Sequence, residues 1–272
     1  MKYRIYTRTE KSRDASHEIN QDRYLFSQYV FNEDGQINLL LVADGMGGLE
    51  DGEKSSQNAL KGFAKYFYEK AADLYLNAQM DGFSISYFAK DAERIIKDAI
   101  CAANETVCKN ADEFKQTGTT ISVVCIIGKY AITANVGDSP IYFYRSKTKS
   151  MSLVSTLQTQ AEEDVKAGCY ERYSADYYRN DHILRQCLGQ YSKLNEEDIC
   201  CQKIGRLETG DKFLLGSDGA FGKIMEEDIF ELLDECSSIE EEEYVLPLLF
   251  NRARIGKKDD QTALFYVVAE EE

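Results

Sequence analysis

The stretch LLLVADGMGG at residues 39–48 is the most informative in this chain, because an apolar run ends on a carboxylate and glycines follow. The continuous apolar run 39–43 predicts a strand that is covered on both faces. A carboxylate at the end of such a strand, Asp44, is costly unless a cation pairs with it. The glycines let the backbone approach a ligand closely, so the carbonyl of Gly45 can reach one. Carboxylate and carbonyl oxygens suit Mg²⁺ or Mn²⁺, although an isolated Asp-Gly is more often an ordinary turn.

The composition is that of a globular protein with a full-size core. Its 272 residues are 43% hydrophobic and 29% charged, with a net charge of −15. The excess of acid repels phosphate backbones, so we expect no nucleic-acid partner. The segment MKYRIYTRTEK lacks an apolar core of the signal-peptide type, and no run approaches the roughly eighteen apolar residues of a membrane span. We therefore expect a cytoplasmic protein that does not bind membranes.

The cysteines do not indicate a metal site or a thiol nucleophile. Eight cysteines form no CxxC pair and are accompanied by two histidines, which argues against zinc. Cys200 and Arg206 have the C-x5-R spacing of cysteine-dependent phosphatases. The five residues between them contain one glycine, however, and Leu207 follows in place of a hydroxyl residue. We interpret the spacing as coincidence.

The pattern of expected elements favours an α+β fold. Short strands rich in β-branched and aromatic residues are predicted at 2–8, 22–30, 37–43, 119–127, 130–136, 141–145, 151–155, 212–216 and 262–268. Helices are predicted at 53–76, 86–108, 226–236 and 239–254, the last with a kink near Pro247. Blocks of strands separated by helices favour α+β over alternating βαβ units. Without a repeat or a proline-rich linker, we expect a single domain over 1–272.

Acidic residues recur at the ends of the predicted strands. They follow a strand, precede one or lie in a turn, each beside glycine or another turn residue: Asp22, Asp44, Asp138, Asp218, and the pair Asp259 and Asp260. If these ends converge, Asp44, Asp218 and Asp259 can hold two hard cations about 3.5–4 Å apart, as in two-metal hydrolases.

The ordered set NQD, ADGMGG, TGTT, NVGDS, SDG and DDQT resembles the motifs of the PP2C-type (PPM) metal-dependent protein phosphatases, bacterial type. The resemblance covers nearly the whole chain, and six motifs in the right order are specific although each is weak. It implies a four-layer α-β-β-α sandwich, with two central antiparallel sheets flanked by helices. It also implies hydrolysis of phosphoserine and phosphothreonine in proteins by a metal-bridging hydroxide, in a monomer that has a serine/threonine kinase as a candidate partner.

The resemblance implies roles for the residues of the metal centre, which would hold Mn²⁺ or Mg²⁺. Asp44 matches the carboxylate that bridges both metals, and the Gly45 carbonyl matches a ligand of the second. Asp218 and Asp259 match ligands of the first. Asp259 is preferred over Asp260 because it stands three residues before the threonine of its motif.

Two further acids have roles implied by the resemblance. Asp22 resembles the acid that holds metal-bound water, so Asp22 and Asp44 are the expected catalytic residues. Asp138, with Asp218, resembles the site of a weaker third metal. The paired threonines of TGTT at 119–120 are interpreted as β-branched core residues.

Two positions depart from the pattern of the family. His17 stands where an arginine contacts the substrate phosphate, and Pro140 stands where another arginine is usual. A histidine can donate one hydrogen bond to phosphate but cannot form the two-pronged guanidinium contact. His17 is therefore either a substituted phosphate contact or a turn residue, and Arg13 or Arg23 are alternatives for that contact. The segment 156–190 corresponds to the flap of the family, which is either a substrate-contacting surface or a packed lid.

These departures leave an alternative function open. A degenerate member of the family can act as a regulatory or binding module without catalysis. Retention of Asp44, Asp218 and Asp259 argues against that alternative, because a chain free of metal gains nothing from clustered, unpaired carboxylates.

Overall fold

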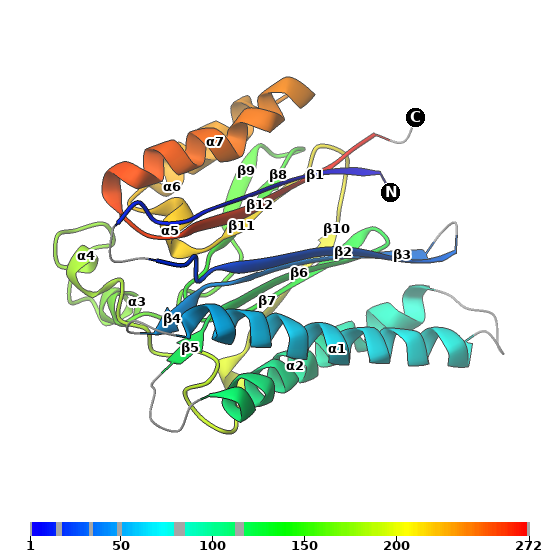
Figure 1. The fold of residues 1–272 in the computed structure, drawn as a ribbon. Coiled ribbons are helices and arrows are strands. Elements are labelled where there is room, and N and C mark those ends of the chain that lie inside the picture. Colours follow the sequence, from blue (N-terminus) through cyan, green and yellow to red (C-terminus); the bar gives the residue numbers. More distant parts are fainter. Residues whose placement is uncertain are drawn as a thin grey trace.

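The structure is a computed structural model that describes residues 2–14, 18–32, 35–47, 51–78, 85–111 and 117–270. Two sheets lie face to face, and helices cover the outer face of each (Figure 1). His17, predicted to be either a phosphate contact or a turn residue, lies outside the described residues. The predicted four-layer α-β-β-α sandwich is confirmed.

Both large sheets are antiparallel throughout. The first has, in spatial order, β1 (Tyr3–Glu10), β12 (Gln261–Val268), β11 (Lys212–Gly216), β8 (Ile141–Arg145) and β9 (Ser150–Leu153). The second has β10 (Cys200–Arg206), β7 (Tyr130–Val136), β6 (Ile121–Ile127), β3 (Gly35–Ala43) and β2 (Arg23–Asn32). A two-stranded ribbon joins β4 (Gly45–Gly47) to β5 (Thr117–Thr119).

The long helices form the two outer layers. Helices α1 (Gly52–Ala78) and α2 (Ile85–Asn110) pack on the second sheet, and α6 (Glu226–Glu235) and α7 (Ile239–Gly256) pack on the first. Helix α7 contains Pro247 in its interior, and the kink there stays a prediction. No helix among the described ranges is long and apolar enough to cross a membrane.

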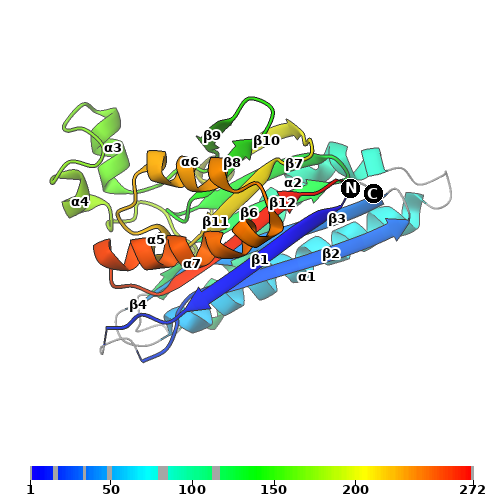
Figure 2. The ribbon, with the colours of Figure 1, turned by 90° about the horizontal axis from the view of Figure 1, so that it is seen from above.

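The short helices gather at one end of the sandwich. They are α3 (Gln160–Lys166), α4 (Tyr177–Asn180), the 3₁₀ turn η1 (Glu196–Asp198) and α5 (Asp218–Phe221). Seen from above, α3 and α4 lie at the end opposite the start of β1 and the end of β12 (Figure 2), where the N–H of Ala269 donates to the carbonyl of Lys2 at 3.0 Å. Figure 1 shows the same arrangement, with β4 and β5 at the end that carries α3 and α4.

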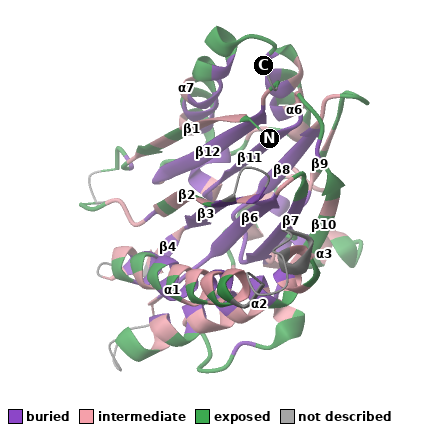
Figure 3. Cartoon of the chain, turned by 90° about the vertical axis from the view of Figure 1, so that its right-hand side faces the viewer, coloured by how far each residue is buried: buried purple, intermediate pink, exposed green. Residues whose placement is uncertain are grey.

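The apolar run of β3 is continuous because its two faces enter two different cores. Leu39 and Leu41 are fully packed against α1 and α2, whereas Leu40 and Val42 lie between the sheets. Successive side chains of a strand point to opposite faces, so a strand covered on both sides needs apolar residues at every position. The central strands are accordingly buried along their lengths, and exposed residues are concentrated on the outer faces of the helices (Figure 3).

Strand β10 was not predicted, because its side chains are mostly exposed or half-buried and show no apolar alternation. It pairs with β7 at the edge of the second sheet. Its ends are Cys200 and Arg206, and six residue steps of extended chain span roughly 20 Å. These two side chains cannot close around one phosphate, so the interpretation of their spacing as coincidence agrees with the structure.

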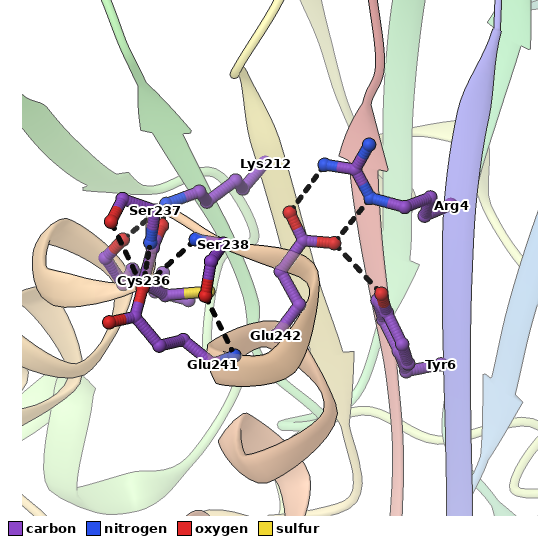
Figure 4. A network of polar contacts seen from close by, with 9 residues as sticks. Arg4, Tyr6, Lys212, Cys236, Ser237, Ser238, Glu241 and Glu242 are labelled. Carbon is purple, nitrogen blue, oxygen red and sulfur yellow. Dashed lines mark hydrogen bonds and ion pairs between the residues drawn. The ribbon is translucent and has the colours of Figure 1, made fainter.

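A buried lysine joins the first sheet to the end of α6, as Figure 4 shows. Lys212 of β11 is 5% exposed, and its Nζ donates hydrogen bonds to the carbonyls of Leu233 and Cys236, each at 2.5 Å. The same ammonium lies 4.8 Å from the ring centre of Tyr144. Its positive charge therefore faces the C-terminal, partly negative end of a helix and the face of an aromatic ring.

The first turn of α7 is fixed to β1 by a second set of contacts (Figure 4). The guanidinium of Arg4 donates to both oxygens of Glu242 at 2.5 Å, and the Tyr6 hydroxyl donates to one of them at 2.9 Å. Ser238 and Glu241 form a capping box at the helix start. These contacts lie far from the acidic strand ends, so they stabilise the sandwich without taking part in its chemistry.

Candidate metal and catalytic site

Acidic residues from separate segments meet at the end of the sandwich where β3 stops and β12 begins. Asp44 follows β3, Asp218 follows β11, and Asp259 lies just before β12. Asp44 is half-buried, and desolvation raises its pKa well above the ordinary value. The charges of Asp22, Asp138, Asp218 and Asp259 raise it further. The structure thus brings the five acids predicted from the strand ends near one another.

Two of these acids are themselves deeply buried. Asp22 is 3% exposed, and burial raises its pKa to about 7 despite the hydrogen bond that Ser217 Oγ donates at 2.7 Å. Asp138 is 8% exposed, and burial together with the charge of Asp218 raises its pKa to about 8. An ionised carboxylate in such surroundings costs free energy unless a cation compensates it.

Lys257 supplies a positive charge at this site. Its ammonium contacts the carboxylate of Asp218 directly and lies 3.3 Å from that of Asp259. Burial acts to lower the pKa of Lys257, but the two carboxylates raise it by more. This position was not predicted from the sequence, because no motif includes Lys257.

The donor set fits a hard divalent cation. All the candidate side chains are carboxylates, which are ligands that Mg²⁺ and Mn²⁺ accept. In the ranges that the structure describes, no three Asp, Glu, His or Cys side chains are already arranged around one point as metal ligands. Two of the expected ligands, Asp218 and Asp259, are instead turned to the ammonium of Lys257.

The neighbouring acids Asp259 and Asp260 have different surroundings. Asp260 is 3% exposed, and its two oxygens accept hydrogen bonds from the backbone N–H groups of Ser12 and Gln21, each at 2.7 Å. It therefore fixes the backbone at Ser12, after β1, and at Gln21, before β2. Asp259 instead faces Lys257, and its charge acts on Asp44. This difference supports the choice of Asp259 as the ligand.

The paired threonines do more than fill the core. Thr119 Oγ1 and the backbone N–H of Thr120 donate to the carbonyl of Asp44 at 2.8 and 2.9 Å. The backbone N–H of Asp44 in turn donates to Thr120 Oγ1 at 3.0 Å, and that hydroxyl lies 2.7 Å from Ser139 Oγ. The two residues hold the backbone of Asp44 and join it to the turn that carries Asp138. Their burial was predicted, but their positioning role was not.

Gly45 is required by close packing of the backbone. A Cβ at this position would collide with the carbonyl oxygen of Gly52 and would lie 2.6 Å from that of Gln21. The start of α1 and the loop before β2 therefore approach the chain directly after Asp44. The role of the Gly45 carbonyl as a metal ligand stays a prediction.

The candidates for the missing phosphate contact are only partly placed. Arg23 Nη1 donates to the backbone carbonyls of Asn20 and Asp22, both at 2.7 Å. Its guanidinium therefore holds the backbone directly before β2. Arg13 is exposed.

The segment 156–190 packs against α6 and also borders the acidic site. Arg172 pairs with buried Glu162 at 2.6 Å and with Glu226 at 2.9 Å, and the Tyr177 hydroxyl donates to Glu162 at 2.7 Å. A pocket of about 100 Å³ lies between this segment and the site, and Asp138 is among its lining residues. The segment is thus a packed lid at one end and a wall of the site at the other.

We expect Asp22 to make the metal-free protein less stable as the pH rises from about 4 to about 8. A carboxyl whose folded-state pKa is raised contributes stability that is complete below its unfolded value of 3.8 and is lost as the pH rises through the folded value, here about 7. Asparagine does not titrate, so Asp22→Asn should gain in melting temperature relative to the natural protein as the pH rises. Melting curves in EDTA at several pH values measure this difference, and a difference that shrinks with pH would contradict the expectation.

Comparison with known proteins settles the family. A sequence model described as Protein phosphatase 2C matches residues 10–253. The chain belongs to this family. Protein phosphatase PhpP of Streptococcus pneumoniae is 25% identical over 260 residues, which cover 93% of each chain. The serine/threonine phosphatase of S. agalactiae has a similar structure, with a TM-score of 0.69, 25% identity and coverage of 98% of this chain and 100% of that one.

A further structural relative of this phosphatase contains metal. The catalytic domain of the serine/threonine protein phosphatase PstP, solved in complex with two manganese ions, matches with a TM-score of 0.69 and 22% identity over 98% of this chain and 99% of its own. The predicted family, fold and protein phosphatase function are therefore confirmed. The carboxylate-lined end of the sandwich is the candidate active site of a 2C phosphatase.

Proposed function

We propose that this protein phosphatase hydrolyses phosphoserine and phosphothreonine in proteins with two bound Mn²⁺ or Mg²⁺ ions. The convergence of half-buried Asp44 with Asp218 and Asp259 carries the proposal. Asp44 would bridge the two ions, with Asp218 and Asp259 at the first and the Gly45 carbonyl at the second. Asp138 and Asp218 would hold a weaker third ion.

The residues of the site would have different roles in the reaction. Bound divalent cations would lower the pKa of water and offset the negative charge on the phosphoryl oxygens. Asp22, whose carboxylate is held by Ser217 Oγ at 2.7 Å, would accept a hydrogen bond from the attacking water and orient it. Thr119 and Thr120 would keep the backbone of Asp44 in place through their bonds to it.

The alternative, a binding module without catalysis, rests on the departures at His17 and Pro140. The buried acids favour catalysis, since Asp44 has a pKa raised by burial and by neighbouring acids. Such a group destabilises a protein that never binds a cation. The retained carboxylates therefore support an active enzyme.

Phosphate release from phosphopeptides tests the proposal. We expect turnover of phosphoserine and phosphothreonine peptides with Mn²⁺ or Mg²⁺, slower turnover of a phosphotyrosine peptide, and no release above background in EDTA. Absence of metal-dependent turnover at any pH would favour the binding module. Faster turnover of phosphotyrosine would overturn the substrate class and leave the metal site standing.

We further propose that residues 1–272 form one phosphatase domain that works as a monomer in the cytoplasm, with a serine/threonine kinase acting on the same substrates. The family match over residues 10–253 supports a single domain. The eight cysteines are all free, which suits a reducing compartment.

A further inference from the structure

We propose that Lys257 is a tethered cation that competes with the divalent ions for the carboxylates of the site and so weakens metal binding. The inference rests on the proposed function, because it assumes that the acids hold metal. It concerns a residue outside the motifs from which the site was recognised. With this lysine in place, metal has to displace an internal ammonium before the site is complete.

The position of Lys257 makes its reach short and defined. Its backbone N–H donates to the carbonyl of Ala253 at 3.0 Å and so closes the C-terminal end of α7. Asp259 follows only two residues later. A side chain fixed at a helix end and placed beside the motif has few alternatives to the acidic site. Its ammonium accordingly contacts Asp218 and lies 3.3 Å from Asp259.

The ammonium acts on the same acids that a metal would need. Its charge lowers the pKa of Asp138 and of Asp259, opposing the effect of burial. A divalent ion bound at about 2.0–2.6 Å from these oxygens would repel an ammonium held in contact with them. The ammonium of Lys257 and a divalent ion therefore cannot both contact the carboxylates of Asp218 and Asp259.

The structure also offers the lysine an alternative position. Its side chain is 28% exposed and borders the pocket of about 100 Å³ that Pro140 and Tyr173 help to line. Displacement of the ammonium into this pocket would free Asp218 and Asp259 to turn toward a metal.

Direct measurement of Mn²⁺ binding tests the competition without any substrate. Lys257→Met removes the charge and keeps the length of the side chain. By calorimetric titration of the full chain, we expect its Kd for Mn²⁺ to fall about tenfold, within the usual range of coupling between two ligands. The metal-free variant should also melt at a lower temperature, because its carboxylates lose their cation, and Mn²⁺ should raise that temperature by more than in the natural protein.

Lys258 provides a matched control. It is the adjacent residue, carries the same charge and is exposed. Lys258→Met should change the Kd for Mn²⁺ by less than about twofold, because a solvent-exposed charge is screened. Lys257→Arg, which keeps the charge, should bind Mn²⁺ about as the natural protein does. Lys257→Gln is the second neutral variant should the methionine variant fail to fold.

The outcomes separate the two proposals. Mn²⁺ affinity in Lys257→Met that equals or falls below that of the natural protein overturns the competition, while binding by the natural protein that Asp44→Asn removes still supports the metal site. Absence of Mn²⁺ binding in both the natural protein and Lys257→Met overturns the competition and the metal site together. Binding that appears only in Lys257→Met supports both.

Discussion

Replacement of Asp44 by asparagine is expected to lower kcat/KM by at least about a thousandfold and at the same time to stabilise the metal-free protein. Asp44 is half-buried, and desolvation together with the charges of four neighbouring acids raises its pKa well above the ordinary value. Asparagine has nearly the same shape but no charge. It therefore relieves repulsion when metal is absent, and it removes the oxygen that would join two cations when metal is present.

Phosphopeptide hydrolysis with Mn²⁺ and melting curves in EDTA measure the two effects. Asp211→Asn is a suitable control because Asp211 is a fully buried acid at the other end of β11. It accepts hydrogen bonds from the N–H groups of Ser146 and Glu208 at 3.0 and 2.9 Å and pairs with Arg145 at 3.0 Å. Its loss should lower the melting temperature and leave kcat/KM within about twofold. Natural turnover in Asp44→Asn, or a lower melting temperature in EDTA, would contradict our assignment.

Replacement of Lys212 by methionine is expected to lower the free energy of unfolding by about 2–4 kcal/mol. The buried ammonium donates to the carbonyls of Leu233 and Cys236, where α6 ends, and lies over the Tyr144 ring. Methionine keeps the apolar stem but leaves two buried carbonyls without this donor, and the negative end of the helix without its cation. Urea denaturation followed by circular dichroism measures the loss.

The neighbouring Lys149 allows the effect of burial to be separated from that of charge. Its side chain is 71% exposed and pairs with Asp234 at 3.5 Å. Lys149→Met should therefore change the free energy of unfolding by no more than about 0.5 kcal/mol. Equal losses in the two variants would mean that the buried contacts of Lys212 are not the cause.

The strands that were predicted are those whose burial produces a recognisable pattern of apolar residues in the sequence. Strand β3 is apolar at nearly every position because it separates two cores, and β7 and β11 were placed at their observed bounds for the same reason. Strand β10 lies at a sheet edge with exposed side chains, so its pairing with β7 left no such pattern. Strand β4, Gly45–Gly47, carries too few side chains to show one.

The acids of the site were predicted because each stands at the end of such a strand. The apolar residues of the strand and the turn residues beside the acid show where that end is. Their order along the chain, read together with the resemblance, was enough to assign the family and the fold. Which acids meet, and which are occupied elsewhere, depends on partners distant in the chain. Asp260 is held by Ser12 and Gln21, more than two hundred residues away.

Thr120 and Lys257 have roles that could not be predicted from their neighbours in the sequence. A threonine in an apolar strand looks like core, and it becomes a support for Asp44 only when β5 and β6 lie beside the end of β3. A lysine after a helix looks like surface, and it enters the acidic site only because α7 packs with its C-terminal end beside Asp218. The periodicity of buried residues is a local property, so it can be recognised in the sequence. Contacts between side chains that are distant in the chain exist only after their segments have packed together.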